Sequence, residues 1–394
     1  MTDGVTGNEG ATGGRDAQLK HTGLRPGWTT GACATAATTA AYTALLTGEF
    51  PDPVTITLPK GQTPSFALAT EDLTVGDRAV GDRAVGDRAV GDRAMAGVVK
   101  DAGDDPDVTH AALIRATVRL LPPGAGVVFR AGPGVGTVTR PGLPLDVGEP
   151  AINPVPRQLM RSHVAEVAAR HGGTGDVEIT VSVDNGAEIA RHTWNPRLGI
   201  LGGLSILGTT GVVVPYSCSA WIDSIRRGVD VARAAGRTHV AGCTGSTSER
   251  TVLAAYDLPE DALLDMGDFA GAVLKYIRRH PVDRLTLCGG FAKLSKLAAG
   301  HLDLHSARSQ VDKNFLSQLA LTAGADTPLA EQVATANTGL EALRLCQSRG
   351  IPLGNEVARR ARDEALAVLR GAPVEVDVIC IDRAGTIVGR SDPA

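Results

Sequence analysis

The stretch Asn195-Pro-Arg-Leu-Gly-Ile-Leu-Gly-Gly-Leu-Ser-Ile-Leu-Gly-Thr-Thr-Gly211 combines features that are seldom found together. It holds five glycines, two adjacent threonines and a serine among six aliphatic side chains. Glycine weakens a helix or strand by about 0.5–1 kcal/mol relative to alanine, so an ordinary helix or strand would avoid so much of it. Two interpretations remain open. The stretch is either a tight crossover between packed layers, or bent, buried backbone whose N–H groups and hydroxyls face a ligand.

The composition of the whole chain narrows the class of protein. Its 394 residues predict two domains, and 43% hydrophobic residues suffice for two large cores. Aromatic residues make up only 3% and the net charge is −4, which argues against a nucleic-acid partner. The longest apolar stretch, 198–214, is too short and too rich in glycine to span a bilayer, so no membrane partner is expected. A homo-oligomer remains open.

The six cysteines are scattered, with no Cys-x-x-Cys pair, so neither a zinc site nor a disulfide framework is predicted. Residues 1–20 are rich in glycine, threonine and aspartate and lack the apolar core of a signal peptide. We interpret them as a disordered tail. Together these features predict a cytoplasmic protein without a resident metal.

An N-terminal α+β domain is predicted over residues 21–205. Val-Gly-Asp-Arg-Ala occurs four times in succession at 75–94, and this low-complexity segment predicts a solvated surface loop. Helices are predicted at 33–46 and 157–171, and strands at 54–58, 65–69, 111–121 and 177–183, while 124–142 is expected to be rich in loops. Asp184-Asn185-Gly186 predicts a hairpin turn to a strand at 187–190, because Asn-Gly accepts positive φ.

A C-terminal α/β domain is predicted over residues 206–394, where short aliphatic runs alternate with helices. The strands expected are 212–214, 239–241, 284–288 and, as the last one, 374–381; the helices are 219–235, 248–256 and 292–299, with 309–370 mainly helical. This alternation is typical of a mostly parallel sheet covered on both faces. The predicted fold is therefore an N-terminal α+β domain followed by a Rossmann-like α/β domain.

Two of these strands end in glycine-rich loops, at 239–249 and 287–293. Ligands of open parallel sheets bind beyond the carboxyl ends of the strands. Neither loop matches the dinucleotide fingerprint or the P-loop, but a nucleoside without phosphates would need neither motif. The alternative is simple helix capping by Ser246 or Ser248. The candidate cofactor-binding residues are Gly242, Thr244, Gly245, Ser246, Gly289 and Gly290.

An acidic run, Asp101, Asp104, Asp105 and Asp107, follows Lys100 and lacks the spacing of an EF-hand. These carboxylates either form Asx-turns within a loop or include one that acts as a base. The candidate catalytic residues are Asp101, Asp104 and Asp105. The run from His301 to His305 has too few ligands in register for a zinc site and is more typical of a surface loop.

Several long segments together resemble one family. They are residues 22–37 (TGLRPGWTTGACATAA), 99–109 (VKDAGDDPDVT), 134–157 (GVGTVTRPGLPLDVGEPAINPVPR) and 190–215 (ARHTWNPRLGILGGLSILGTTGVVVP), with a looser match at 287–306. They resemble the cobalt-precorrin-5B C(1)-methyltransferases of anaerobic cobalamin synthesis, the CbiD family. The segments occur in the order of the family and span roughly residues 22–385 of the sequence.

The resemblance implies transfer of a methyl group from S-adenosylmethionine to carbon 1 of a cobalt-bearing tetrapyrrole. Such a reaction is mostly a problem of positioning, and the loss of a proton makes a base useful. The carboxylate arms of the substrate need cationic and N–H donors. The residues that the resemblance suggests for the substrate are Thr29, Thr30, Gly31, Lys100, Arg157, Arg197, Thr209, Thr210, Gly211, Lys293 and His305.

The chain departs from the family pattern in the repeat at 75–94, which is not a family feature, and in two motifs. Gly289-Gly290-Phe291-Ala292-Lys293 stands where the family usually has Gly-His-x-Gly-Lys, and Leu304-His305-Ser306 replaces Thr-His-Ser. Gly290 cannot replace a histidine that contacts a ligand. Two alternatives are therefore kept: a non-catalytic corrinoid-binding carrier or scaffold, and a nicotinamide-dependent reductase, against which the missing dinucleotide fingerprint argues.

Overall fold

The computed structural model describes residues 23–74 and 91–391. The predicted tail at 1–20 and positions 75–90 of the predicted repeat loop lie outside the described residues. Two of the last repeat residues are not loop: Arg93 and Ala94 begin strand β5 (Arg93–Val99), and Ala94 is buried in the core. No helix within the described ranges has the length and apolarity needed to cross a bilayer.

The chain separates into two compact units. Unit 1 takes Met1–Thr139 and Pro144–Ser217, and unit 2 takes Arg140–Leu143 and Cys218–Ala394. The boundary thus lies beyond the position predicted after residue 205. The physical reason is that strand β13 (Val212–Val213) pairs with β1 (Gly27–Trp28), which keeps the end of the glycine-rich stretch in unit 1.

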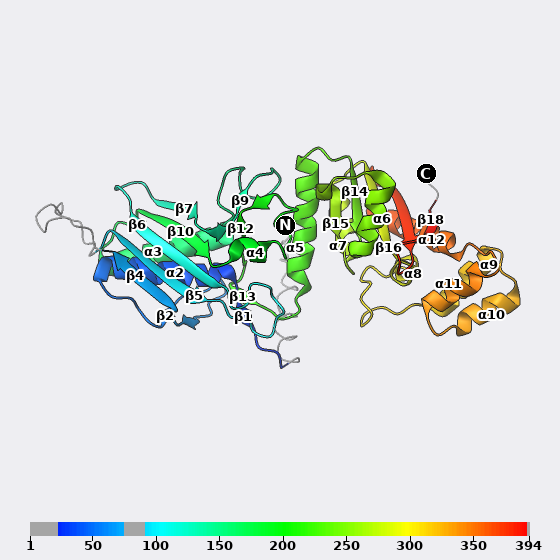
Figure 1. Cartoon of the computed structure of the whole chain (residues 1–394), viewed down its shortest axis with the longest axis horizontal. Coiled ribbons are helices and arrows are strands. Elements are labelled where there is room, and N and C mark those ends of the chain that lie inside the picture. The colour runs from blue at the N-terminus through cyan, green and yellow to red at the C-terminus, as the bar shows by residue number, and fades with distance from the viewer. Residues whose placement is uncertain (1–22, 75–90, 392–394) are drawn as a thin grey trace, which may run out of the picture. The chain divides into compact units, whose positions relative to one another are not determined.

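Unit 1 is a mixed α and β structure (Figure 1). Its helices are α2 (Thr30–Thr47), α3 (Pro154–His171) and the short α4 (Gly186–Ala190). Its strands are β1 (Gly27–Trp28), β2 (Val54–Thr55), β3 (Ser65–Phe66), β4 (Thr70–Thr74), β5 (Arg93–Val99), β6 (Leu113–Leu120), β7 (Val127–Ala131), β8 (Gly134–Val135), β9 (Thr137–Val138), β10 (Val177–Val183), β11 (Ile200–Leu201), β12 (Gly203–Leu204) and β13 (Val212–Val213).

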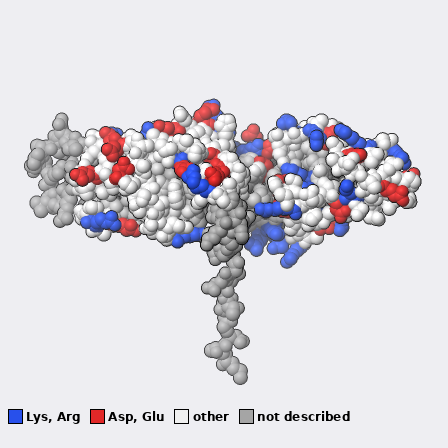
Figure 2. Space-filling model, turned by 90° about the horizontal axis from the view of Figure 1, so that it is seen from below, with Lys and Arg blue, Asp and Glu red and all other residues white. Residues whose placement is uncertain are grey.

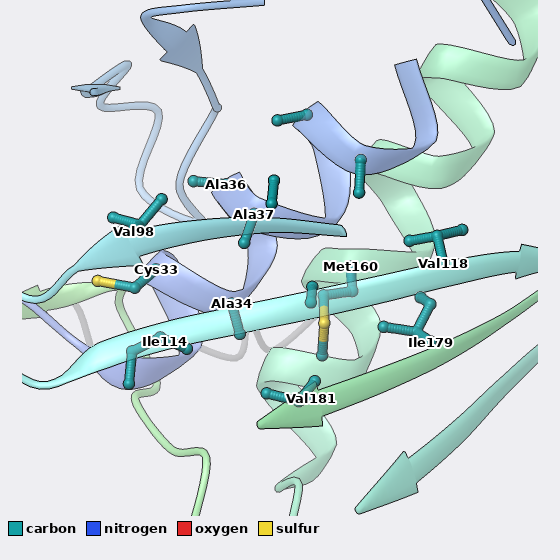
Figure 3. Close-up of a cluster of buried hydrophobic side chains, with 14 of the residues drawn as sticks. Cys33, Ala34, Ala36, Ala37, Val98, Ile114, Val118, Met160, Ile179 and Val181 are labelled. Atoms are coloured by element: carbon teal, nitrogen blue, oxygen red, sulfur yellow. The ribbon is translucent and has the colours of Figure 1, made fainter. Parts of the chain in front are cut away.

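The core of unit 1 lies between α2, α3 and a five-stranded sheet in the order β4-β5-β6-β10-β7. Helix α2 begins where the Thr29 side chain accepts a hydrogen bond from the Ala32 amide, and it ends at Gly48 with φ 87°. Its many alanines allow the helix to lie close to the strands. Figure 3 shows small side chains of α2 beside larger ones from α3 and the sheet: Ala34, Ala36, Ala37, Val98, Ile114, Ile179 and Met160.

The predicted hairpin at 184–186 is wrong. Asn185 does adopt positive φ, at 55°, but it precedes helix α4 and not a strand. Both sides of β10 are already paired, antiparallel with β6 and parallel with β7. No place beside β10 is left for a hairpin partner, and β7 itself comes from the segment 124–142 that was expected to be rich in loops.

Unit 2 alternates strands and helices. Its helices are α5 (Cys218–Ala234), α6 (Ser246–Tyr256), the 3-10 helix η1 (Glu260–Ala262), α7 (Ala270–Ile277), α8 (Phe291–Ala298), α9 (Lys313–Thr322), α10 (Thr327–Thr335), α11 (Gly339–Gln347) and α12 (Leu353–Leu369). Its strands are β14 (His239–Cys243), β15 (Leu263–Asp265), β16 (Arg284–Gly290), β17 (Glu375–Ile381) and β18 (Ile387–Arg390). Strand β18 follows β17, so the strand predicted as the last one is not the last.

The unit 2 sheet has the order β15-β14-β16-β17-β18. The pairs β14–β15, β14–β16 and β16–β17 are parallel, and β17–β18 is antiparallel. Helix α6 packs on one face through Val252, whereas α7, α8 and α12 contribute to the core on the other face. If the five strands are numbered in chain order, the order across the sheet is 2-1-3-4-5. The second strand lies on one side of β14 and the later strands lie on the other, so the strand order reverses between β14 and β16.

Unit 2 also includes the short segment Arg140–Leu143, which comes from the middle of unit 1 in sequence. Arg140 Nη1 lies 3.1 Å from Asp261 Oδ2, and Arg237 Nε donates to Asp261 Oδ1 at 3.0 Å. A Cβ atom on Gly142 would lie 2.6 Å from the Asp230 carbonyl oxygen, so the segment lies directly on α5. Asp261 is buried, and two guanidinium groups supply the opposite charge that its carboxylate needs there.

Candidate functional site

Charged side chains of both signs lie on the face of the molecule shown in Figure 2. Many of the cations are paired within the chain. Arg119 and Arg130, for example, both contact Glu178, at 2.8 and 3.1 Å. Exposed pairs of this kind stabilise a fold by about 0–1 kcal/mol, but they occupy the donors that an anionic ligand would need. An anionic ligand is therefore expected to bind Lys or Arg side chains whose N–H donors are not all used within the chain.

The glycine-rich stretch meets the start of helix α2. Thr30 Oγ1 accepts a hydrogen bond from the Leu207 amide at 3.0 Å, and the Gly31 amide donates to the Leu207 carbonyl at 2.9 Å. The Thr29 amide donates to the Gly211 carbonyl at 3.0 Å. The structure thus brings together four residues predicted for the substrate, but their polar groups bind one another. This end of the stretch is a packed crossover.

The turn of this crossover reaches the surface at two residues of the predicted set. Thr209 is exposed and Thr210 is half-buried, whereas Thr29 and Thr30 are 7% and 3% exposed. Gly208 allows the turn, because a Cβ atom there would lie 2.3 Å from Thr29 Oγ1. The Thr210 hydroxyl donates to the Val212 carbonyl at 3.2 Å, so of these four threonines Thr209 is the one best placed to present its hydroxyl to a ligand.

The three aspartates predicted as a base hold the loop 101–105 in place. Asp101 accepts two hydrogen bonds from the Arg25 guanidinium, and Asp104 Oδ2 accepts one from the Arg25 amide at 2.6 Å. Asp105 Oδ1 accepts one from the Tyr216 amide at 2.7 Å. The Arg25 hydrogen bond, with help from the Gly103 amide, lowers the pKa of Asp101 to about 2. A carboxylate with so low a pKa is a weak proton acceptor.

Asp101→Asn should reduce stability in a pH-dependent way. The folded pKa is depressed, so the contribution of this carboxylate is present above its unfolded pKa of about 3.9 and is lost as the pH falls through the folded value. Urea titrations should show a lower midpoint for the variant at pH 7 and a shrinking difference from wild type between about pH 4 and pH 2. A difference that stays constant over this range would contradict the assigned pairing with Arg25.

Two cations predicted for the substrate are engaged within unit 1. Lys100 is 1% exposed, and its Nζ lies 2.7 Å from Asp107 Oδ2. Arg157 donates to the carbonyl oxygens of Ile152 and Pro150 at 2.7 and 3.0 Å, and to the Glu149 carboxylate. These side chains hold the chain in place and do not face outward.

Two further residues of the predicted set are more accessible. The Arg197 guanidinium carbon lies 5.2 Å from the centre of the Trp194 ring, an arrangement typical of a cation–π contact. His305 is exposed, and its Nδ1 accepts a hydrogen bond from the Ala307 amide at 3.2 Å. Arg197 belongs to unit 1 and His305 to unit 2.

The carboxyl edge of the unit 2 sheet carries the loops predicted for the cofactor. The loops after β14 and β16 flank the point where the strand order reverses, which is where open parallel sheets bind ligands. A Cβ atom on Gly245 or Gly290 would meet nothing within 4 Å, so the space above both is open. Gly289 differs, because a Cβ atom there would lie 2.6 Å from Thr244 Cγ2. Its bare backbone lets the two loops lie together.

Two other residues of this predicted set have different places. Gly242 lies within β14, and a Cβ atom there would lie 3.1 Å from Leu287 in the core. It therefore faces inward, below the edge. Ser246 begins helix α6, next to Gly245. Ser248, and not Ser246, bonds back to Gly245: its Oγ donates to the Gly245 carbonyl at 2.6 Å.

The end of β15 and the segment 266–269 that follows it complete this edge, and sequence reasoning missed them. Lys293 Nζ lies 3.1 Å from Asp268 Oδ1 and donates to the Thr244 carbonyl at 3.2 Å. Trp221 is 40% exposed, and its indole N–H donates to the Asp265 carbonyl at 2.9 Å. The signal that could have found this loop is the aliphatic pair before Asp265-Met266-Gly267-Asp268, although a strand of three residues is easily overlooked.

A hollow of about 580 Å³ lies at the other edge of the same sheet, lined by residues that precede β14 and β16, among them Arg237, Thr238, Pro281 and Asp283. Because ligands of such sheets bind beyond the carboxyl ends, we do not assign the predicted cofactor to this hollow. Over the described part of the chain, no three His, Cys, Asp or Glu side chains are grouped to hold a metal ion.

Comparison with known proteins identifies the family. Residues 17–215 match the CbiD family and residues 303–392 match the CbiD C-terminal domain. A Brucella anthropi protein named cobalt-precorrin-5B C(1)-methyltransferase is 62% identical over 367 residues, which cover 93% of this chain and 95% of that protein. A Brucella suis protein of the same name is 61% identical over the same share of each chain.

Among solved structures, a cobalamin biosynthesis protein (cbiD) from Archaeoglobus fulgidus is 25% identical, with a TM-score of 0.37, and the match covers 72% of this chain and 83% of that chain. The sequence matches confirm the resemblance found in the motifs of both halves of the chain. The similarity to the Brucella proteins extends over nearly the whole length of this chain and of each relative. The chain therefore belongs to the CbiD family.

Proposed function

We propose that this protein transfers a methyl group from S-adenosylmethionine to carbon 1 of cobalt-precorrin-5B, giving cobalt-precorrin-6A in cobalamin biosynthesis. The observation that carries the proposal is the identity of 61–62% over 93% of the chain to proteins named for this reaction. The reaction breaks the bond between sulfur and methyl carbon, forms a carbon–carbon bond at the ring and releases a proton. Catalysis then depends chiefly on holding the sulfonium in line with the ring carbon.

The donor is assigned to the carboxyl edge of the unit 2 sheet, which we interpret as a Rossmann-like nucleoside site. The open backbone at Gly245 and Gly290 leaves space where the strand order reverses. S-adenosylmethionine has no phosphates, so the absence of a phosphate-binding motif is no obstacle. The residues present fit the group, because carboxylate, ammonium and bare backbone N–H groups suit a nucleoside with an amino-acid head.

The remaining predicted residues are assigned to the tetrapyrrole substrate and to the base. Arg197 and Thr209 are the residues of the unit 1 substrate set whose placement favours contact with its carboxylate arms, whereas the Thr210 hydroxyl is bound to Val212. Asp104 and Asp105 stay candidates for the base, and Asp101 is the least suited of the three because of its low pKa. We expect the enzyme to act in the cytoplasm on this small-molecule substrate, without nucleic acid or membrane, and its oligomeric state is open.

The test is an anaerobic assay with cobalt-precorrin-5B and S-adenosylmethionine labelled in the methyl group. We expect the label to appear in the tetrapyrrole in an amount that increases with enzyme concentration. Folded protein that binds the tetrapyrrole but has no affinity for S-adenosylhomocysteine would instead support the corrinoid carrier or scaffold. Tetrapyrrole reduction with NADH would support the reductase.

A further inference from the structure

Lys293 joins the three loops at the carboxyl edge of the unit 2 sheet. It lies in the first turn of α8, directly after β16. Its Nζ donates to the carbonyl of Thr244, which follows β14, and lies 3.1 Å from the carboxylate of Asp268, which follows β15. The side chains of Lys293 and Asp268 are 36% and 24% exposed. Both charges are thus held at the edge and remain accessible from it.

Within this ion pair, part of the hydrogen-bonding capacity of both side chains is unused. A cation in the first turn of a helix opposes the helix dipole, and α8 has no acidic residue there to offset it. Asp268 Oδ1 is buried, and no described residue gives it a hydrogen bond of good geometry; Lys293 lies near it only as a charge. The ammonium has three N–H donors, of which Thr244 takes one.

We propose that Asp268 and Lys293 bind the amino-acid head of the methyl donor, with Lys293 contacting its carboxylate and Asp268 its ammonium. The inference rests on the proposed function and extends it to named contacts. For the head to bind, the 3.1 Å contact between the two side chains opens, and the zwitterion then gives each charge a new partner of opposite sign, so that neither is left unpaired. The helix dipole of α8 then favours the bound carboxylate. This reassigns Lys293 from the tetrapyrrole to the donor.

The space beside the pair fits the rest of the donor. Gly245 follows Thr244 in sequence, and Gly290 precedes Lys293 by one turn of helix. A Cβ atom at either glycine would meet nothing within 4 Å, so the nucleoside has room next to the head. The donor would thus lie across the point where the strand order reverses.

Calorimetry with two ligands tests the assignment in the full-length protein. S-adenosylhomocysteine has the amino-acid head, and 5′-methylthioadenosine has the same nucleoside and sulfur without it. We expect K293M to weaken binding of S-adenosylhomocysteine about 10- to 100-fold, the usual effect of losing a charged hydrogen bond, and to leave binding of 5′-methylthioadenosine unchanged. K275M, which removes an exposed lysine of α7, is the matched control and should bind both ligands like wild type.

Two further variants sharpen the test. K293R keeps the charge and should retain most of the affinity, whereas D268N should also weaken S-adenosylhomocysteine selectively. Equal loss of both ligands in K293M, or no loss of either, would overturn the inference while leaving the proposed function standing. Failure of the wild type to bind either ligand would overturn the donor site itself. Thermal unfolding of each variant shows whether it is folded, and K293Q replaces K293M if that protein is not.

Discussion

Gly134→Ala should be among the most destabilising single substitutions in this protein. Gly134 begins strand β8 with φ 79°, and a Cβ atom there would lie 2.0 Å from the Val183 carbonyl oxygen. The same site is crowded from two other sides, because Cβ atoms on Gly186 and Gly203 would each lie 2.2 Å from the Gly134 carbonyl oxygen. Three backbone segments meet here with no room for a methyl group. We expect unit 1 to lose about 3 kcal/mol or more of its free energy of unfolding.

Gly202→Ala is the matched control for this prediction. Gly202 lies next to Gly203 and also has positive φ, at 86°, but a Cβ atom there would meet nothing within 4 Å. Alanine at this position costs only the left-handed conformation, about 1–2 kcal/mol. Urea titration followed by far-ultraviolet circular dichroism gives both values. Equal losses in the two variants would show that backbone conformation, and not close approach, sets the requirement at Gly134.

Asp107→Asn should cause a second large loss. Lys100 is 1% exposed, and Asp107 Oδ2 is 2.7 Å from its Nζ. The substitution leaves a buried ammonium without a counter-charge, and breaking a buried pair in this way costs about 3–5 kcal/mol. Glu364→Gln removes one end of the more exposed pair with Arg360 and should cost no more than about 1 kcal/mol. Similar losses in both variants would contradict the importance given to burial.

The loss caused by Asp107→Asn should also depend on pH. Burial raises the pKa of Asp107, but the Lys100 ammonium and the Thr109 donors outweigh it, so the pKa lies below its ordinary value. A depressed folded pKa means that the carboxylate stabilises the fold above its unfolded pKa of about 3.9, and that this stabilisation disappears as the pH falls through the folded value. The difference between wild type and variant should therefore be largest near neutral pH.

Local patterns in the sequence predict most of the elements that form the two cores. The alanine-rich run after Thr29 predicts α2, because a threonine cap and small side chains are both local signals. Reasoning from local signals fails at Asn185. The positive φ is correctly expected there, but the residue precedes a helix and not a strand. Whether a strand or a helix follows such a residue depends on β6 and β7, which already occupy both sides of β10.

Only those parts of the candidate site that have a local sequence signal could be predicted. Gly245 and Gly290 could be found because aliphatic strands precede them in sequence, and the edge where parallel strands end follows from the alternation. Lys100 is suggested by its charge and by its place in a segment that resembles the family, and only the distant fold decides that it faces inward toward Asp107. Asp268 could not be found, since its contact with Lys293 joins two loops that only the assembled sheet brings together.

The segment Arg140–Leu143 imposes an order of events on newly made protein. Translation adds residues from the N-terminus at about 5–20 per second, so Arg140 leaves the ribosome on the order of ten seconds before Asp261, its partner in the ion pair, has been synthesised. Until then the segment has neither the carboxylate nor α5 to bind. A gene fragment that starts at Cys218 would lack these four residues altogether and would encode an incomplete second unit.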